Sequence, residues 1–480
     1  MQQQDKQQGI SFARGKIQQS LEQTWPPLSK QGGSFMENKW SSKLGFILAS
    51  AGAAIGLGAI WKFPYVTGMN GGGAFLLIFI ILTLLVGMPM LISEFIIGRG
   101  TGKEAVSAYD TLAPGSNWRI IGRLGVVGCF LLLSFYSVVG GWLLVYTVMS
   151  LFGLVIQNGA DYGATFGYII SSAWITPLST LLFIIINIVI IALGVRNGIE
   201  RASKYMMPTL FVFFIILVVR ALTLEGAMEG VIFFLKPDFS AITAEGVLYA
   251  LGQSFFALAV GFSCMVTYSS YLDKNVSLPS SASSVVIMNL IVSIFAGLVI
   301  FPVVFAFGFE PAEGPGLLFI VLPAVFSNIA FGEFFLAIFL ILFFFATLTS
   351  SISLFEIIVA SITAKGKHSR KKIAWISGIV VFIAGIPAGL SSGLLSEVIL
   401  FGKNIFDVTD YLVSNILLPL GNLLIALFIG FKMNRKLMKE EFMLAGNWSA
   451  GLFNAWFFLM RYIVPVTIII VFLNMLGLIG

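Results

Sequence analysis

Long apolar stretches alternate with short polar segments from about residue 42 to the end of the chain. A helix needs about 20 mainly apolar residues to cross the hydrocarbon layer of a membrane. Eleven stretches have that length, at roughly 42–66, 74–98, 119–152, 174–194, 203–224, 246–271, 284–308, 333–363, 373–391, 405–430 and 453–478. The pattern predicts an all-α polytopic membrane protein with 11 transmembrane helices.

The composition supports this interpretation, because 58% of the residues are hydrophobic and only 10% are charged. Such a chain has too few solvated groups to cover a soluble domain, so we expect a lipid bilayer around it. Residues 1–40 are the exception, since they are Gln-rich and polar. We expect them to form a mobile cytoplasmic tail, followed by a single transmembrane transporter domain at 41–480.

Lysine and arginine predict the orientation, because cytoplasmic loops retain positive charge. Most of the 28 Lys and Arg residues fall in the first 40 residues and in every second loop after them. We therefore expect a multi-pass protein of the cell (plasma) membrane with a cytoplasmic N-terminus and an extracellular C-terminus. The net charge of +6 follows from this bias, and no basic cluster with interleaved aromatics points to nucleic acid.

Two spans contain glycine clusters at matching positions. The first has Gly52, Gly56 and Gly58, and the sixth has Gly252 and the sequence 261–263. Unwinding a helix there frees backbone groups that are costly in lipid unless protein, water or a ligand satisfies them. A matched pair of such breaks in two halves predicts the solute site of a transporter. The alternative is that the glycines only let helices pack closely.

Polar side chains inside other spans are further candidates. The eighth span has four hydroxyls within 346–351, which either face the site or bond back to their own helix. Ionisable residues at membrane depth are functional candidates because they are costly in lipid; here they are Lys62, Glu94, Glu356, Asp407 and Asp410. The two glutamates lie near cytoplasmic span ends and are interpreted as structural.

Five motifs follow one another along these spans: Trp40–Phe46, Gly52–Pro64, Asn70–Phe75, Gly87–Pro89 with Glu94 and Gly98–Arg99, and Thr267–Tyr271. Together they resemble the signatures of the neurotransmitter:sodium symporter family over about 40–478, and eleven spans resemble its bacterial leucine and hydrophobic amino-acid transporters. The resemblance implies a leucine-transporter-like fold with two inverted five-helix repeats, at about 42–224 and 246–430, and helix 11 at about 453–478. It also implies that helices 1 and 6 are unwound around an amino-acid site.

The resemblance implies site residues as well. The second sodium site of the family falls on Gly52, Ile55, Ala346, Thr349 and Ser350, which offer the oxygen ligands that a hard cation favours. The substrate positions fall on Ala54, Gly56, Gly58, Tyr136, Phe256, Ala259, Phe262, Ser350 and Leu354, with the Tyr136 hydroxyl as the carboxylate ligand. The gate positions fall on Lys62, Asp410, Tyr136 and Phe256.

The chain departs from the family pattern at the first sodium site, whose positions are Ala54, Ala59, Ala257 and Asn289. Ala59 and Ala257 stand where the family has Asn and Thr or Ser, so two side-chain oxygens are missing. The chloride set is weakened too, with Phe79 in place of a Tyr, although Gln253 and Ser293 remain. We therefore expect one coupled Na⁺ and no chloride requirement.

Both gates also differ from the family. The outer gate normally joins Arg to Asp, whereas this chain has Lys62 opposite Asp410 or Asp407, and Lys lacks the bidentate fork of Arg. At the inner gate, Glu37 and Lys365 form either a swapped ion pair or two solvated surface charges.

These observations predict a sodium-coupled secondary active symporter that imports an amino acid, neutral or hydrophobic, by alternating access. The expected partners are a small-molecule substrate, Na⁺ and the lipid bilayer. The alternatives are a transport-dead sensor on the same fold, a carrier of a non-amino-acid solute and a carrier driven by another ion. An intramembrane enzyme is disfavoured, because the chain has one histidine and lacks the Gly-x-Ser-x-Gly and His-Glu-x-x-His motifs.

Overall fold

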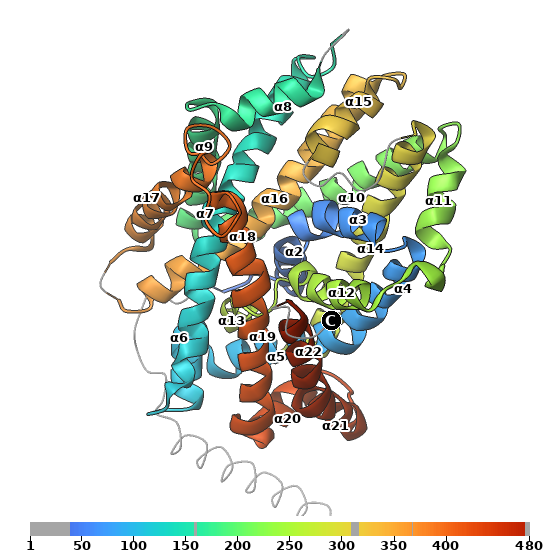
Figure 1. The fold of residues 1–480 in the computed structure, drawn as a ribbon. Helices are drawn as coiled ribbons and strands as arrows, with labels where there is room; N and C mark the ends of the chain where they lie inside the picture. Colours follow the sequence, from blue (N-terminus) through green and yellow to red (C-terminus); the bar gives the residue numbers. More distant parts are fainter. Residues whose placement is uncertain (1–38, 158–160, 309–315, 367, 476–480) are drawn as a thin grey trace, which may run out of the picture. The chain divides into compact units, whose positions relative to one another are not determined.

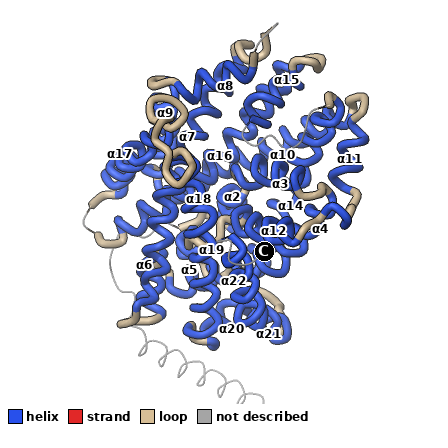
Figure 2. The backbone as a smooth tube through the Cα atoms, viewed as in Figure 1, coloured by secondary structure: helices blue, strands red, loops and turns tan. Residues whose placement is uncertain are grey.

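The computed structural model describes residues 39–157, 161–308, 316–366 and 368–475. Within these ranges the chain consists of helices and loops with two isolated backbone bridges (Figure 2). Nine of the described helices are long and apolar enough to cross a membrane, and one bent pair makes a tenth span if it is counted once. The prediction of an all-α protein with many membrane-length helices is confirmed. Most of the predicted tail, including Glu37, lies outside the described residues.

The nine spans follow one another along the chain. They are Gly73–Thr101 (α4 Gly73–Leu82, η2 Thr83–Gly87 and α5 Met88–Thr101), Asn117–Leu151 (η3 Asn117–Arg119 and α7 Ile120–Leu151), Ile175–Ala192 (α9), Val195–Leu222 (η4 Val195–Glu200 and α10 Arg201–Leu222), Leu278–Ala306 (α14), Gly332–Thr363 (α16), Arg370–Gly389 (α17), Ile405–Lys432 (α18 Ile405–Tyr411, η7 Leu412–Leu417, α19 Leu418–Leu427 and η8 Phe428–Lys432) and Ala450–Asn474 (α21 Ala450–Phe458, η9 Leu459–Ile463 and α22 Val464–Met475). Shorter helices connect them: α6 Ala105–Leu112, α8 Tyr162–Ser171, α11 Ala227–Leu235, η5 Phe239–Ala241, η6 Leu317–Val321, α15 Leu322–Phe326 and α20 Arg435–Met443.

The first predicted span is the bent pair. Helix α2 (Lys43–Ala54) ends before Ile55, whose φ of −87° and ψ of 89° take the backbone out of the helix. The chain resumes as η1 (Gly58–Lys62) and α3 (Phe63–Met69), and the two halves meet at an angle of 53°. The break predicted from the glycine cluster is therefore confirmed.

The sixth predicted span is interrupted more widely. Helices α12 (Ala244–Ala257) and α13 (Cys264–Ser270) are separated by residues 258–263. Gly261 has a φ of 106°, and Ala259 and Ser263 also have positive φ, which costs free energy for a residue with a side chain. Neither half is long enough to span a membrane alone, so helix length does not decide between ten spans and eleven.

The two broken spans lie among the long helices. Helix α2 packs against α10, α14 and α16, and α12 packs against α4 and α19. Figure 1 shows α2, α3 and α12 in the middle of the view, with α7 and α16 to their left. Residues at both breaks, such as Ile55, Gly56 and Val260, are buried. The freed backbone is thus enclosed by protein, as a membrane requires.

Helices α5 and α13 approach each other at backbone level. Gly98 on α5 faces the carbonyl of Val266 on α13, and any Cβ at position 98 would overlap with it. The Ser269 hydroxyl on α13 donates to the Glu94 carbonyl oxygen on α5 at 3.4 Å. Small residues that permit such close approach are typical of helix packing in membranes. This contact fixes α13 against α5.

Candidate functional site

Protein side chains satisfy the backbone at the break between α12 and α13. The buried Glu94 carboxylate accepts hydrogen bonds from Gly261 N at 2.7 Å and Met265 N at 3.1 Å. Asn422 Nδ2 on α19 donates to Val260 O at 3.2 Å. A carboxylate that accepts from several backbone N–H groups makes charge-assisted bonds, which are stronger than neutral ones. The second break is therefore held by the protein itself.

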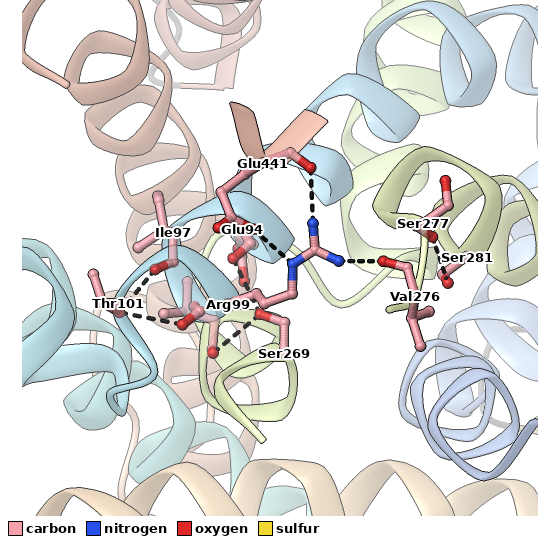
Figure 3. A network of polar contacts seen from close by, with 11 residues as sticks. Glu94, Ile97, Arg99, Thr101, Ser269, Val276, Ser277, Ser281 and Glu441 are labelled. Atoms are coloured by element: carbon pink, nitrogen blue, oxygen red, sulfur yellow. Dashed lines mark hydrogen bonds and ion pairs between the residues drawn. The ribbon is translucent and has the colours of Figure 1, made fainter. Parts of the chain in front are cut away.

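Figure 3 shows Glu94 close to a second polar cluster at the end of α5. Arg99 Nε pairs with Glu441 Oε2 at 2.6 Å, and Arg99 Nη2 donates to Glu441 O at 2.7 Å. A third bond runs from Arg99 Nη1 to Val276 O. Arg99 and Glu441 are buried, so the cluster connects α5, the segment before α14, and α20 through desolvated charges. Sequence reasoning missed this cluster, because nothing local to Arg99 indicates a partner on α20.

Hydroxyl and amide groups satisfy the break after α2. Leu57 N donates to the Tyr136 hydroxyl oxygen at 3.4 Å, and Gln253 Nε2 donates to Gly58 O at 2.6 Å. The Ser350 hydroxyl on α16 lies 3.0 Å from the Gly52 carbonyl oxygen. All of these partners are neutral, so the first break is held by weaker bonds than the second.

A cavity lies between the two breaks. It is lined by Ala53, Ala54, Gly56, Leu57, Gly58, Leu132, Tyr136, Phe256, Ala259, Phe262, Cys264, Ser350, Leu354 and Leu418. This set contains every substrate position that the family resemblance implies. Gly56 is required beside the cavity, because an added Cβ would lie 2.7 Å from the Tyr136 hydroxyl oxygen. The wall is apolar apart from two hydroxyls, one thiol and the backbone of the breaks, which suits a small solute with one polar end.

The residues of the predicted second sodium site also come together, between α2 and α16. Ser350 Oγ donates toward the Gly52 and Ala53 carbonyl oxygens at 3.0 and 3.1 Å. Thr349 Oγ1 lies 3.0 Å from Ala346 O, and an added Cβ on Gly52 would lie 2.9 Å from Thr349 Cβ. Ile55, the fifth position, is the residue that leaves the α2 helix. Carbonyl and hydroxyl oxygens of this kind are suitable ligands for Na⁺.

The first sodium site contains one polar side chain, Asn289 on α14. Its Nδ2 donates to Ala257 O at 2.8 Å and lies 3.5 Å from Ala54 O. Its Oδ1 is buried and has no hydrogen-bond partner among the described residues. Ala59 is fully buried and adds no side-chain oxygen. The structure therefore brings Asn289 together with the carbonyls of Ala54 and Ala257, which accept from its amide.

The outer gate residues adopt an arrangement that differs from a simple ion pair. Lys62 Nζ lies over the Phe256 ring, 4.9 Å from its centroid. Asp410 Oδ1 accepts from the Ser414 hydroxyl at 2.7 Å, and among the described residues Lys62 has no carboxylate within 4.0 Å. Lys62 therefore contacts Phe256, one of the two aromatic gate residues, on the wall of the cavity.

The described chain begins with two contacts that hold residues 39 and 40 to the segment after the sixth span's break. Lys39 pairs with Asp273 at 2.7 Å, and Trp40 Nε1 donates to Tyr268 O at 2.8 Å. The side chains of Lys39 and Asp273 are 54% and 51% exposed, so this ion pair contributes little stability. The Glu37–Lys365 pair cannot be placed, because Glu37 lies outside the described residues.

A buried ion pair lies nearby, between α16 and α17. Glu356 pairs with Arg370 and accepts from the Tyr271 hydroxyl at 2.9 Å. The sequence indicates a structural role for Glu356 but does not predict Arg370 or Tyr271 as its partners. A signal was present, however: a glutamate in an apolar span requires a partner, and Arg370 begins the next span.

Membrane-length helices around two broken spans, with a cavity between the breaks, define the architecture of a membrane transporter. The model of the Sodium:neurotransmitter symporter family matches residues 37–157 and 172–478. The chain belongs to this family. Its relatives are transporters rather than enzymes, and Na⁺ is the coupling ion.

Individual relatives are similar over nearly the whole chain. The sodium-dependent transporter YhdH of Bacillus subtilis is 53% identical over 443 residues, which cover 92% of this chain and 98% of the relative. A sodium-dependent transporter of Haemophilus influenzae is 40% identical, covering 91% and 97%. The crystal structure of MhsT in complex with L-phenylalanine matches with a TM-score of 0.85 and 42% identity, covering 91% of this chain and 99% of MhsT.

Proposed function

We propose that this chain is a symporter that imports a neutral or hydrophobic amino acid across the plasma membrane by alternating access. The observation that carries the proposal is the cavity between the two breaks, which combines freed backbone and the Tyr136 hydroxyl with apolar walls. MhsT, whose fold is similar at 42% identity, was solved in complex with L-phenylalanine. An amino acid has the matching chemistry, with a charged end and an apolar side chain.

The two ends of the solute have different partners in this proposal. The carboxylate accepts from the Tyr136 hydroxyl and lies near the start of the helical segment at Gly58, where the helix dipole favours negative charge. The side chain packs against Phe256, Phe262 and Leu354. Burying that apolar surface contributes about 25 cal/mol per Å², so larger apolar side chains bind more tightly until the cavity is full.

The count of oxygen ligands favours one sodium ion, bound at Gly52, Ile55, Ala346, Thr349 and Ser350. This site offers two hydroxyls in addition to carbonyls. The first site offers one side-chain oxygen, that of the Asn289 amide, in addition to carbonyls. A sodium ion that leaves water needs several oxygens at once, and the second site provides two side-chain oxygens where the first provides one.

The remaining features of the proposal concern chloride and topology. Phe79 stands at the family's chloride tyrosine, and its ring packs 4.8 Å from the Phe63 ring, so this position offers an apolar contact in place of a hydroxyl. We propose transport without chloride. We also propose eleven spans, which are the ten counted by helix length and the broken sixth span. The first ten along the chain form two inverted five-helix repeats, and the N-terminus is cytoplasmic and the C-terminus extracellular.

The Na⁺ dependence of ligand binding tests the proposal. A thermal-shift screen of the purified protein against amino acids, in Na⁺ and in K⁺, first identifies a ligand, because a binder raises the unfolding temperature by mass action. We expect a Hill coefficient for Na⁺ near one in the unmodified protein. Thr349→Ala should abolish the effect of Na⁺ on ligand binding, whereas Asn289→Ala should change the apparent Na⁺ affinity less than twofold. Cooperativity between two ions would refute the single-ion assignment. Sodium-driven counterflow in vesicles separates a carrier from a transport-dead sensor.

A further inference from the structure

An arginine lies inside the last described span without a carboxylate partner. Arg461 belongs to η9, within the span Ala450–Asn474. Its guanidinium is 5.1 Å from the Phe431 ring centroid, 5.6 Å from that of Tyr462 and 6.0 Å from that of Phe457. Ionisable residues in a span are costly and need a partner. Stacking on rings stabilises the cation only in part.

A second arginine contacts one of these rings, that of Phe457. Arg435, at the start of α20, lies 4.8 Å from the Phe457 centroid and 5.9 Å from that of Phe453. The two guanidiniums are therefore no farther apart than the sum of their distances to Phe457. We call Arg435 and Arg461 the arginine pair. Like charges within this distance repel each other, and an anion that contacts both guanidiniums would offset the repulsion.

The described protein does not supply that anion. Its ion pairs join Lys39 to Asp273, Arg99 to Glu441, Lys204 to Glu200 and Arg370 to Glu356, and neither member of the arginine pair takes part. Arg435 Nη2 donates to the neutral Asn454 amide oxygen at 2.9 Å. Arg461 Nε is buried and has no hydrogen-bond partner among the described residues. Glu441, on the same helix as Arg435, is already engaged by Arg99.

The surroundings of the arginine pair are both basic and apolar. Lys432, Lys436 and Lys439 add positive charge on η8 and α20. The aromatic side chains of Phe431, Phe458 and Tyr462 are 58%, 54% and 51% exposed. Figure 1 shows α20 and α21 together at the lower end of the view, below α19 and α22. A ligand for this surface therefore needs an anionic group and an apolar body.

We propose that the arginine pair binds the phosphate of an anionic phospholipid whose acyl chains lie along Phe431, Phe458 and Tyr462. A guanidinium presents two parallel donors to phosphate oxygens, which a lysine cannot do. Basic residues between helices at a membrane surface bind anionic headgroups, and each adds to the affinity. A free phosphate ion would leave the exposed rings uncovered, so the lipid fits the surface better. The phospholipid would bridge η8 at the end of one span and η9 in the next, whose backbones meet at Gly430 and Arg461.

Native mass spectrometry of the detergent-solubilised full chain tests this proposal. We expect phosphatidylglycerol to bind at least tenfold more tightly than phosphatidylcholine. Arg435→Gln combined with Arg461→Gln is expected to weaken phosphatidylglycerol binding about thirtyfold, because it removes two guanidinium contacts to the phosphate. The matched control is Lys436→Gln combined with Lys439→Gln, which also removes two positive charges, both from α20, and we expect less than a threefold change in phosphatidylglycerol binding.

Three outcomes would overturn the proposal. Equal losses in the arginine and lysine variants would show a non-specific charge effect. Displacement of phosphatidylglycerol by millimolar inorganic phosphate would identify a phosphate site rather than a lipid site. Equal binding of both lipids by the unmodified protein would exclude headgroup recognition. If the glutamine variant unfolds, Arg435→Lys with Arg461→Lys keeps the charge and loses the fork, and we expect it to bind about threefold to tenfold more weakly than the unmodified protein.

Discussion

The two broken spans are stabilised in different ways. At the break between α12 and α13, a buried carboxylate accepts from Gly261 N and Met265 N, and an amide on α19 donates to Val260 O. At the break after α2, the partners are the Ser350 and Tyr136 hydroxyls and the Gln253 amide. The break between α12 and α13 uses a carboxylate, whereas the break after α2 uses only hydroxyl and amide groups.

This difference indicates which break a ligand can enter. Replacing a charge-assisted bond inside the membrane costs more than replacing a neutral one. A hydroxyl can also reverse its role, because it donates to a carbonyl in one orientation and offers a lone pair to a cation in another. We therefore expect the break after α2 to exchange partners during the transport cycle, while the break between α12 and α13 keeps its own.

The largest effect is expected for Glu94→Ala. This change removes two charge-assisted bonds of about 1.5–3 kcal/mol each and leaves two buried N–H groups without partners. We expect a loss of about 3–6 kcal/mol in the free energy of unfolding, measured by denaturation in detergent. Ser93→Ala is the control. The Ser93 hydroxyl donates to Pro89 O in its own helix, and Pro89 O keeps a second donor, Trp456 Nε1, when the hydroxyl is removed. Equal stability of the two variants would remove the basis of the comparison.

Gly261→Ala is expected to be the next most damaging. Its φ of 106° is strained for alanine, and the added Cβ would lie 3.0 Å from Leu418 O. We expect a loss of about 1–3 kcal/mol in stability, measured in the same denaturation experiment. Gly167→Ala is the matched control, because position 167 is helical and has nothing within 4 Å of an added Cβ. A neutral Gly261→Ala would mean that the break adapts easily.

Tyr136→Phe tests the solute side of the first break. We expect solute binding to weaken by about 1–3 kcal/mol, because the charged end of the solute loses a buried donor. Isothermal titration with the ligand from the thermal-shift screen measures this change. Tyr146→Phe is the control on the same helix, since the buried Tyr146 hydroxyl has no hydrogen-bond partner among the described residues. Unchanged affinity in Tyr136→Phe would refute its role as carboxylate ligand.

Ser350→Ala is expected to have the smallest effect on stability. Loss of the bonds to the Gly52 and Ala53 carbonyls costs about 1 kcal/mol in a Na⁺-free buffer. The stabilisation that Na⁺ gives the unmodified protein should disappear in the variant. Ser353→Ala is the control, because its hydroxyl bonds to Ser350 O within α16. Thermal unfolding with and without Na⁺ measures both, and a full Na⁺ response in Ser350→Ala would place the ion elsewhere.

The sequence predicted membrane-length apolar helices and both breaks, because each of these depends on a local signal. Apolar length marks a span, and glycine clusters such as Gly56 and Gly58 mark a break. The residues that line the cavity followed from the family resemblance. Their roles in binding stay predictions.

The partners of buried charges were much harder to predict. The sequence marks Glu94 as structural without indicating its contact to Gly261, and it shows Arg99 only as part of a motif. The Arg99–Glu441 bond joins residues 342 positions apart, and such a pairing depends on how α5 and α20 pack. Lys62 was paired with Asp410 by analogy, whereas the structure places its ammonium on the Phe256 ring. Sequence spacing contains no information on such contacts between distant segments.

The close contact of Gly98 with Val266 has a mechanical consequence. Two helices separated by flexible side chains can slide along each other in a shear motion, but backbones in direct contact cannot. The Glu94 carboxylate joins the same two helices through Met265 N. We therefore expect α5 and α13 to move as one rigid unit, with rotation confined to residues 258 and 259 because the Asn422 amide holds Val260 O, so that the sixth span works as a hinge rather than as a sliding element.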